Sequence, residues 1–222
     1  MKTTILLALV ATALPALAGS GKAPAQVAPP APEASTISYD FIGAGWNRTL
    51  DGLSVDGLGT TDIDGYDINL SKTITGGLFG FANFGQGFAD ISGQGVTVDL
   101  ETLAAAVGVG YHVGVASNVD FVVQAGAAYT EFDASASGFG VTVPLGSGDE
   151  WGAVGAAGFR IALTNWLELN LFYNAGYFDS EYSNAGSANL IFRNIVSTVD
   201  LVLSGSINED VESIGAGLRY NF

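Results

Sequence analysis

The last eleven residues, 212–222, alternate between apolar and polar positions. Ile214, Leu218 and Phe222 share one face of an extended chain, whereas Arg219 lies on the other. Because successive side chains of a strand point to opposite faces, this alternation predicts a strand with one apolar face. A strand that crosses a membrane within a barrel needs apolar residues towards lipid and aromatic residues at the interface, and this segment has both.

The alternation recurs from Thr36 to the C-terminus and predicts an all-β fold: an eight-stranded antiparallel transmembrane β-barrel with meander topology. Short turns follow the second, fourth and sixth predicted strands, and long connections follow the others. This asymmetry, with an even strand number, is typical of bacterial outer-membrane barrels. The predicted strands are Thr36–Arg48, Ile63–Ile74, Leu78–Phe88, Thr102–Val113, Val119–Thr130, Trp151–Leu163, Leu167–Tyr177 and Val211–Phe222.

We expect the long connections to be extracellular loops, with the short turns and both termini in the periplasm. The last connection contains an apolar segment, Leu190–Ile207, which is either a hairpin above the membrane or two further strands, giving ten. We favour eight, because Arg193, Asn194 and Asp200 would interrupt a lipid-facing surface, where charge is costly. The expected loops are Thr49–Asp62, Ala89–Glu101, Glu131–Glu150 and Asp179–Asp210.

Two of the predicted strands have an open register. In each, aromatic residues occur on both faces, so alternation does not identify the lipid-facing side. A shift of one residue would exchange the two faces. The alternatives are Tyr39 and Phe41 against Ile42, Ala44 and Trp46 in the first strand, and Phe79 and Phe81 against Leu78, Phe84 and Phe88 in the third.

The N-terminal region predicts export. Residues 1–18 combine a positively charged start, the apolar segment Ile5–Leu14 and an Ala16-Leu17-Ala18 cleavage site, as in a secretory signal peptide. Residues 19–35 are rich in Ala and Pro and predict an extended periplasmic linker. We therefore expect the barrel to occupy residues 36–222.

Composition agrees with a membrane-spanning β-sheet and excludes several classes of binding site. Hydrophobic residues make up 48% of the chain and charged residues 13%, yet no apolar run beyond the N-terminus is long enough for a membrane helix. The net charge of −15 argues against binding to nucleic acid, which depends on Lys and Arg. The absence of Cys excludes disulfides and thiolate metal sites.

Three segments resemble the small porin-like outer-membrane β-barrel proteins of Gram-negative bacteria: Ser38–Gly45, Trp166–Asn170 and Gly215–Phe222. The resemblance implies an integral outer-membrane barrel without an appended periplasmic domain. It also implies that Tyr220 and Phe222 form the C-terminal signal for the barrel-assembly machinery, with periplasmic chaperones acting during biogenesis. The family's functions are diverse, so the resemblance alone does not define an activity.

No catalytic, cofactor or metal site is predicted. His112 is the only histidine, and it lies near a short turn, so we expect a lumen or interface position. No phosphate-binding loop or nucleophile elbow is present. Acidic residues concentrate in the long connections, which makes divalent cations candidate ligands there, with Asp62 and Asp64 as a weak local match.

A network of charged side chains is expected inside the barrel. Charges in a narrow lumen are stabilised by pairing, and Arg160 and Glu168 flank one turn, so we expect these two to be neighbours. The inward-pointing residues of this predicted network are Asp67, Asp120, Arg160, Glu168 and Arg219.

Two functions fit these expectations. The first is a non-enzymatic outer-membrane protein with a structural or surface-interaction role, because side chains fill the interior of an eight-stranded barrel. The alternative is a narrow porin that passes small solutes or ions.

Overall fold

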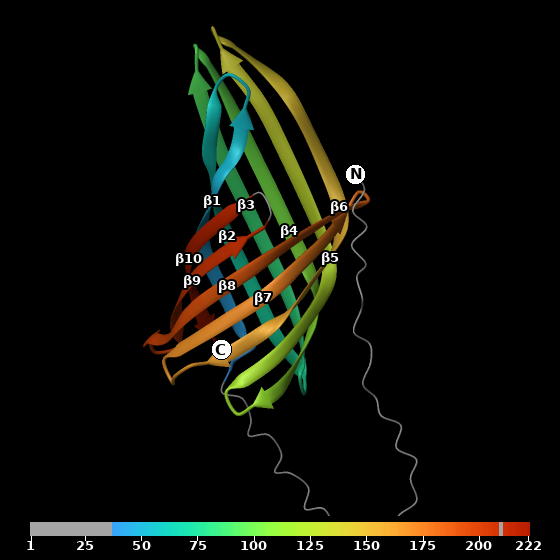
Figure 1. The fold of residues 1–222 in the computed structure, drawn as a ribbon, viewed down its shortest axis with the longest axis vertical. Coiled ribbons are helices and arrows are strands. Elements are labelled where there is room, and N and C mark those ends of the chain that lie inside the picture. The colour runs from blue at the N-terminus through green and yellow to red at the C-terminus, as the bar shows by residue number, and fades with distance from the viewer. Residues whose placement is uncertain (1–36, 209–210) are drawn as a thin grey trace, which may run out of the picture. The chain divides into compact units, whose positions relative to one another are not determined.

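A computed structural model describes residues 37–208 and 211–222, and these form a closed antiparallel β-barrel (Figure 1). Each strand pairs with its neighbours in sequence, and β10 closes the barrel against β1. No described helix is long and apolar enough to cross a membrane. The strands are β1 (Phe41–Val55), β2 (Gly59–Thr75), β3 (Leu78–Gly93), β4 (Val96–Ala116), β5 (Val119–Gly138), β6 (Val141–Ala162), β7 (Leu167–Phe178), β8 (Glu181–Val196), β9 (Val199–Ile207) and β10 (Glu212–Asn221).

The closed antiparallel barrel is confirmed, but the preferred number of eight strands is wrong, and the alternative of ten is correct. The apolar segment of the last connection forms parts of β8 and β9. Asp200 does not interrupt the lipid face, because it points into the lumen and pairs with Arg219. Arg193 and Asn194 lie where the β8–β9 register shifts, between Phe192 and Val196, at the end of the pair.

The predicted signal peptide (1–18) and the linker (19–35) lie outside the described residues. The first strand starts later than expected, at Phe41. The segment before it does not join the sheet: Ile37 and Tyr39 are buried inside the barrel.

The exposed fractions of alternate side chains show which face of β1 and of β3 points outwards, the question that the sequence left open. In β1, Ile42 and Trp46 are exposed on the outer surface, and Phe41 lines the lumen. In β3, Phe84 and Phe88 face outwards, while Phe79 and Phe81 are buried inside. Phe79 and Phe81 fill space over Gly110 and Gly108 of the neighbouring β4, where any larger residue would collide with their rings.

The outer surface of the barrel carries the apolar band that the alternation predicted. Side chains such as Val107, Val109 and Leu171 are largely exposed there, which suits contact with lipid acyl chains. Aromatic side chains border this band at both ends, as in barrels that sit in a membrane. Exposed members include Trp46, Tyr66, Trp151, Tyr177 and Tyr182 on the long-hairpin side, and Tyr111, Trp166, Tyr220 and Phe222 on the short-turn side.

The expected long loops are mostly wrong, because the strands continue through them. The β3–β4 pairing runs to Gly93 and Val96, and the β5–β6 pairing runs to Gly138 and Val141. The β6–β7 pairing, in contrast, ends at Gly152. The upper parts of β3, β4, β5 and β6 therefore form a sheet that stands beyond the ends of β7–β10 (Figure 1). We call residues 89–101 and 131–150 the upper sheet.

Candidate functional site

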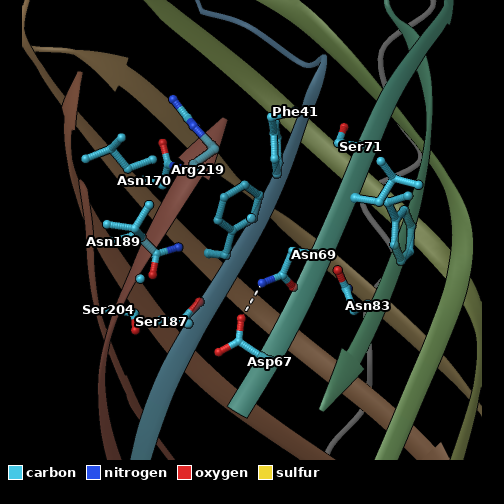
Figure 2. Close-up of a pocket in the computed structure, with 18 of the residues that line it drawn as sticks. Phe41, Asp67, Asn69, Ser71, Asn83, Asn170, Ser187, Asn189, Ser204 and Arg219 are labelled. Atoms are coloured by element: carbon cyan, nitrogen blue, oxygen red, sulfur yellow. Dashed lines mark hydrogen bonds between the residues drawn. The ribbon is translucent and has the colours of Figure 1, made fainter. Parts of the chain in front are cut away.

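The lumen contains a cavity of about 420 Å³, which we call the chamber. Two strands more than an eight-stranded barrel widen the interior, which explains why side chains do not fill it. Its wall is mostly uncharged and combines polar with apolar side chains, with Arg219 and Asn170 towards one end and Asp67 and Ser204 towards the other (Figure 2). The polar wall includes Asn69, Ser71, Asn83, Gln124, Asn174, Ser187 and Asn189.

A buried ion network lies at one end of the chamber. Glu168 is fully buried, and its Oε1 accepts hydrogen bonds from Arg160 Nε at 2.9 Å and Nη2 at 2.6 Å. Arg219 donates from Nε and Nη2 to Asp200 Oδ2, at 2.9 and 2.7 Å, and its Nη2 lies 3.6 Å from Glu168 Oε2. The four side chains thus link β6, β7, β9 and β10 through alternating charges, which offsets the cost of burying them.

Tyr39 continues this buried layer and contacts residues of β4, β5 and β6. Its ring lies between the Arg160 guanidinium, 4.4 Å from the ring centroid, and the His112 imidazole, stacked at 3.9 Å. Its hydroxyl donates to Asp120 Oδ2 at 3.1 Å. Phe79 packs against its other edge, at 4.9 Å between centroids. We call Tyr39, Phe79, Asp120 and the four ion-network side chains the floor.

The predicted network is brought together except for one member. Arg160 and Glu168 are neighbours, as expected, and Arg219 joins them. Asp120 lies directly opposite Arg160 on the paired strand β5, and Tyr39 contacts both. Asp67 stands apart in the chamber wall, where Asn69 and Asn47 donate side-chain hydrogen bonds to it.

Sequence reasoning missed Tyr39, Phe79 and Asp200 as parts of the site. Tyr39 lies in a segment that was read as the start of a strand, and Asp200 in one that was read as a loop. A signal for Asp200 was available: in β9 it occupies the polar face opposite Val199 and Leu201, the position of a lumen residue. Nothing in the alternation distinguishes a residue that plugs a lumen from one that lines it.

The remaining candidate residues, His112 and the pair Asp62 and Asp64, lie at separate places in the barrel. His112 packs in the lumen against Tyr39 and Asp120, 3.4 Å from the carboxylate. Among residues 37–208 and 211–222, no group of three or more His, Asp or Glu side chains could hold a metal ion. Asp62 and Asp64 instead pair with Arg48 at the outer surface.

The C-terminal residues lie on the outside of the barrel, next to its seam. Tyr220 and Phe222 are about half exposed and stack with centroids 6.4 Å apart. The Phe222 backbone N–H donates to the Asp40 carbonyl at 3.2 Å, and Lys72 Nζ lies 4.7 Å from its ring centroid. The last residue therefore ties β10 to the first residues of the barrel.

Comparison with solved structures finds other outer-membrane proteins. Ail, the attachment invasion locus protein of Yersinia pestis, is 14% identical, with a TM-score of 0.42 over 82% of this chain and 95% of Ail. OprG from Pseudomonas aeruginosa is 16% identical, with a TM-score of 0.41 over 83% and 96%. The translocator domain of the autotransporter NalP from Neisseria meningitidis is 10% identical, with a TM-score of 0.50 over 84% and 90%. At these identities the likeness bears on the fold alone.

No curated protein matches the sequence. The family comparison is more informative, because residues 4–222 match the family described as outer membrane protein beta-barrel domain. The match spans nearly the whole chain and agrees with the closed barrel, the outward apolar band and the two aromatic borders. The chain belongs to the outer membrane protein β-barrel domain family.

Proposed function

We propose that this protein is a closed, non-enzymatic outer-membrane barrel whose function is structural or lies in surface interaction. The observation that carries the proposal is the floor. Glu168 and Asp120 have no exposed surface, and Asp200 is 1% exposed, which describes a sealed layer rather than a pore lining. A chamber that ends at such a layer does not connect the two sides of a membrane.

The proposed orientation places the short turns and both chain termini in the periplasm and the upper sheet outside the cell. Support comes from the family's architecture, in which short turns are periplasmic and longer connections extracellular. A protease-cleavage sequence inserted after Gly140, at the β5–β6 tip, should be cut in intact cells. The same insertion at Ser117, in a short turn, should be cut only after the outer membrane is opened. The reverse pattern would refute the orientation.

Conductance tests the closed lumen. Wild-type protein in planar bilayers should give no steady current of general-porin size. Glu168→Gln removes the carboxylate charge between Arg160 and Arg219, so we expect brief small openings to become more frequent. Asn189→Gln in the chamber wall is the matched control, because it retains a neutral amide away from the ion network. A stable wild-type conductance would overturn the proposal.

A narrow porin is the second candidate, and the polar chamber is the observation that favours it. About 420 Å³ of space, whose wall includes amides and hydroxyls beside apolar side chains, suits small solutes, provided that the floor rearranges. This candidate predicts that wild-type protein lets a small sugar into liposomes at a rate above that of empty liposomes. Swelling no faster than in empty liposomes would leave the closed barrel as the better account.

A further inference from the structure

The upper sheet reverses the polarity of the barrel below it. Residues that are directly opposite on paired antiparallel strands lie on the same face. One such row crosses all four strands and continues the lumen-facing side: Ile91, Val98, Ala136 and Val143. Apart from Glu150, which lies opposite Thr130 on the same side, the inner face is thus mainly apolar here, whereas the lumen face at the chamber includes several Asn and Ser side chains.

The outer face of the upper sheet is acidic and contains like charges in register. Asp90 lies opposite Asp99, Glu101 opposite Asp133, and Glu131 opposite Asp149. Like charges directly opposite each other destabilise a strand pair. The sequence has no Lys or Arg between Lys72 and Arg160, so this repulsion has no internal compensation from a neighbouring basic side chain.

Only part of the apolar inner face is covered. On the β3–β4 side, Ala89, Ile91 and Val98 are buried, and Leu58 from the β1–β2 hairpin lies close to Gly93. On the β5–β6 side, Phe132 is 47%, Val143 51% and Val141 62% exposed. Large apolar side chains gathered beyond the membrane band are a recognised mark of an interaction surface.

Among the described residues, one edge of β6 has no paired strand over residues 141–150, within the upper sheet. Residues 141–150 pair with β5 on one side, and pairing with β7 begins only at Gly152. An unpaired edge presents backbone donors and acceptors to an added strand. The acidic outer face of the same sheet repels a second copy of this chain, so self-association through this edge is disfavoured.

We propose that the β6 edge of the upper sheet binds an extended, basic polypeptide segment from outside the cell. The two faces of the sheet differ, and only a partner at the edge reaches both of them. An added strand with alternating residues would place apolar side chains beside Val141 and Val143 and a Lys or Arg side chain beside Asp149, which lies opposite Glu131 of β5. Bound basic residues would also relieve the cross-strand repulsion. This inference rests on the surface-interaction role and the orientation proposed above.

Three synthetic nonapeptides test the assignment on full-length protein in zwitterionic nanodiscs, with empty nanodiscs subtracted. They alternate Lys with Val, Lys with Ser, and Glu with Val, and binding is read by fluorescence anisotropy. We expect saturable binding of the Lys/Val peptide only, weakening as salt is raised. Hydrogen exchange should show new protection of backbone amides within residues 145–150 of β6.

Variants locate the site. Asp149→Asn and Val143→Ser should each weaken binding of the Lys/Val peptide by about two- to fivefold, as expected for single cross-strand contacts. Asp99→Asn is the matched control, because Asp99 carries the same charge on β4, two strands from the edge. Equal binding of the Lys/Ser peptide, equal loss in Asp99→Asn, or protection confined to other strands would overturn the proposal. None of these outcomes bears on the closed lumen, which conductance tests separately.

Discussion

At the scale of single residues, Tyr39 connects the apolar and charged parts of the floor. It packs on Phe79, stacks on His112, lies against Arg160 and donates to Asp120. The adjacent backbone adds a further contact, since Arg160 Nη1 donates to the Ser38 carbonyl at 3.0 Å. A residue that precedes the first strand therefore contacts both the apolar and the charged parts of the floor, through its ring and its hydroxyl group.

Substitution at Tyr39 should separate these two contributions. Tyr39→Ala removes the ring between Arg160 and His112, so we expect frequent small openings in planar bilayers. Tyr39→Phe keeps the ring and loses only the hydrogen bond to Asp120, which costs about 1–3 kcal/mol with the buried acceptor left unpaired, so the lumen should stay closed. If both variants stay as closed as the wild type, Tyr39 is not the plug.

Asp40, which precedes β1, should contribute to acid sensitivity. Its Oδ1 accepts a 2.6 Å hydrogen bond from the Thr73 backbone N–H and lies 3.6 Å from Lys72 Nζ. The Thr73 hydrogen bond, assisted by Lys72, lowers the pKa of the Asp40 carboxyl below its usual value. A lowered folded-state pKa stabilises the fold above the unfolded pKa of about 4, and this contribution is lost as pH falls through the folded pKa.

The variant Asp40→Asn isolates this contribution. The urea midpoint of the wild type should fall more steeply than that of Asp40→Asn as pH is lowered from about 5 to about 2.5. The difference between the two proteins is the measured quantity, because other carboxyl groups titrate in both. Parallel curves would show that the contact with Thr73 does not stabilise the barrel.

At the scale of the strands, the lipid face of β7 and the lumen face of β8 should differ in how much they tolerate a substitution by arginine. Leu171 is 42% exposed on the lipid face, midway along β7, and Asn189 lines the chamber. Leu171→Arg should lower the free energy of unfolding by about 2–4 kcal/mol if the residue lies near the bilayer midplane. Asn189→Arg should cost much less, because the new charge meets a polar cavity. Folding titrations in lipid vesicles measure both, and equal losses would mean that the assigned faces are wrong.

Sequence alternation was sufficient to predict which residues face lipid in the strands whose outer face is largely apolar. The faces of β2, β4, β5, β6, β7 and β10 agree with the prediction. It failed for β8 and β9, because a charge such as Asp200 was judged as a defect in a lipid face, although its partner Arg219 lies on the adjacent strand. The register between paired strands determines which side chains meet, so the alternation within one segment does not predict these partners.

The upper sheet was missed for a different reason. Alternation continues through Ala89–Gly93 and Val141–Glu150, but with the apolar face now turned inwards. Outside the bilayer, the outer face of a strand does not contact lipid and need not be apolar. An outward apolar face therefore identifies only the membrane-spanning part of each strand. The Arg160–Glu168 contact, in contrast, was predictable, because a short turn places the two residues near each other.

For the whole molecule, closure depends on a seam between the first and last strands. The β1–β10 pairing runs from Phe41 opposite Asn221 to Leu50 opposite Glu212. Phe222 extends the seam by its hydrogen bond to Asp40 and by its ring beside Lys72. Because every other strand pair is local in sequence, this pair is formed by the most distant segments of the barrel, and its loss leaves two open sheet edges.

Deletion of Phe222 should therefore sharply lower the amount of assembled barrel in the outer membrane. Phe222→Asp should act similarly, because it places a carboxylate where the exposed ring meets the membrane interface. Phe222→Trp retains an aromatic ring suited to that interface and is the matched control. Heat-modifiable gel mobility of membrane fractions measures the assembled form. Normal amounts of heat-modifiable protein in both the deletion and Phe222→Asp would show that the terminal aromatic residue is not needed to close or deliver the barrel.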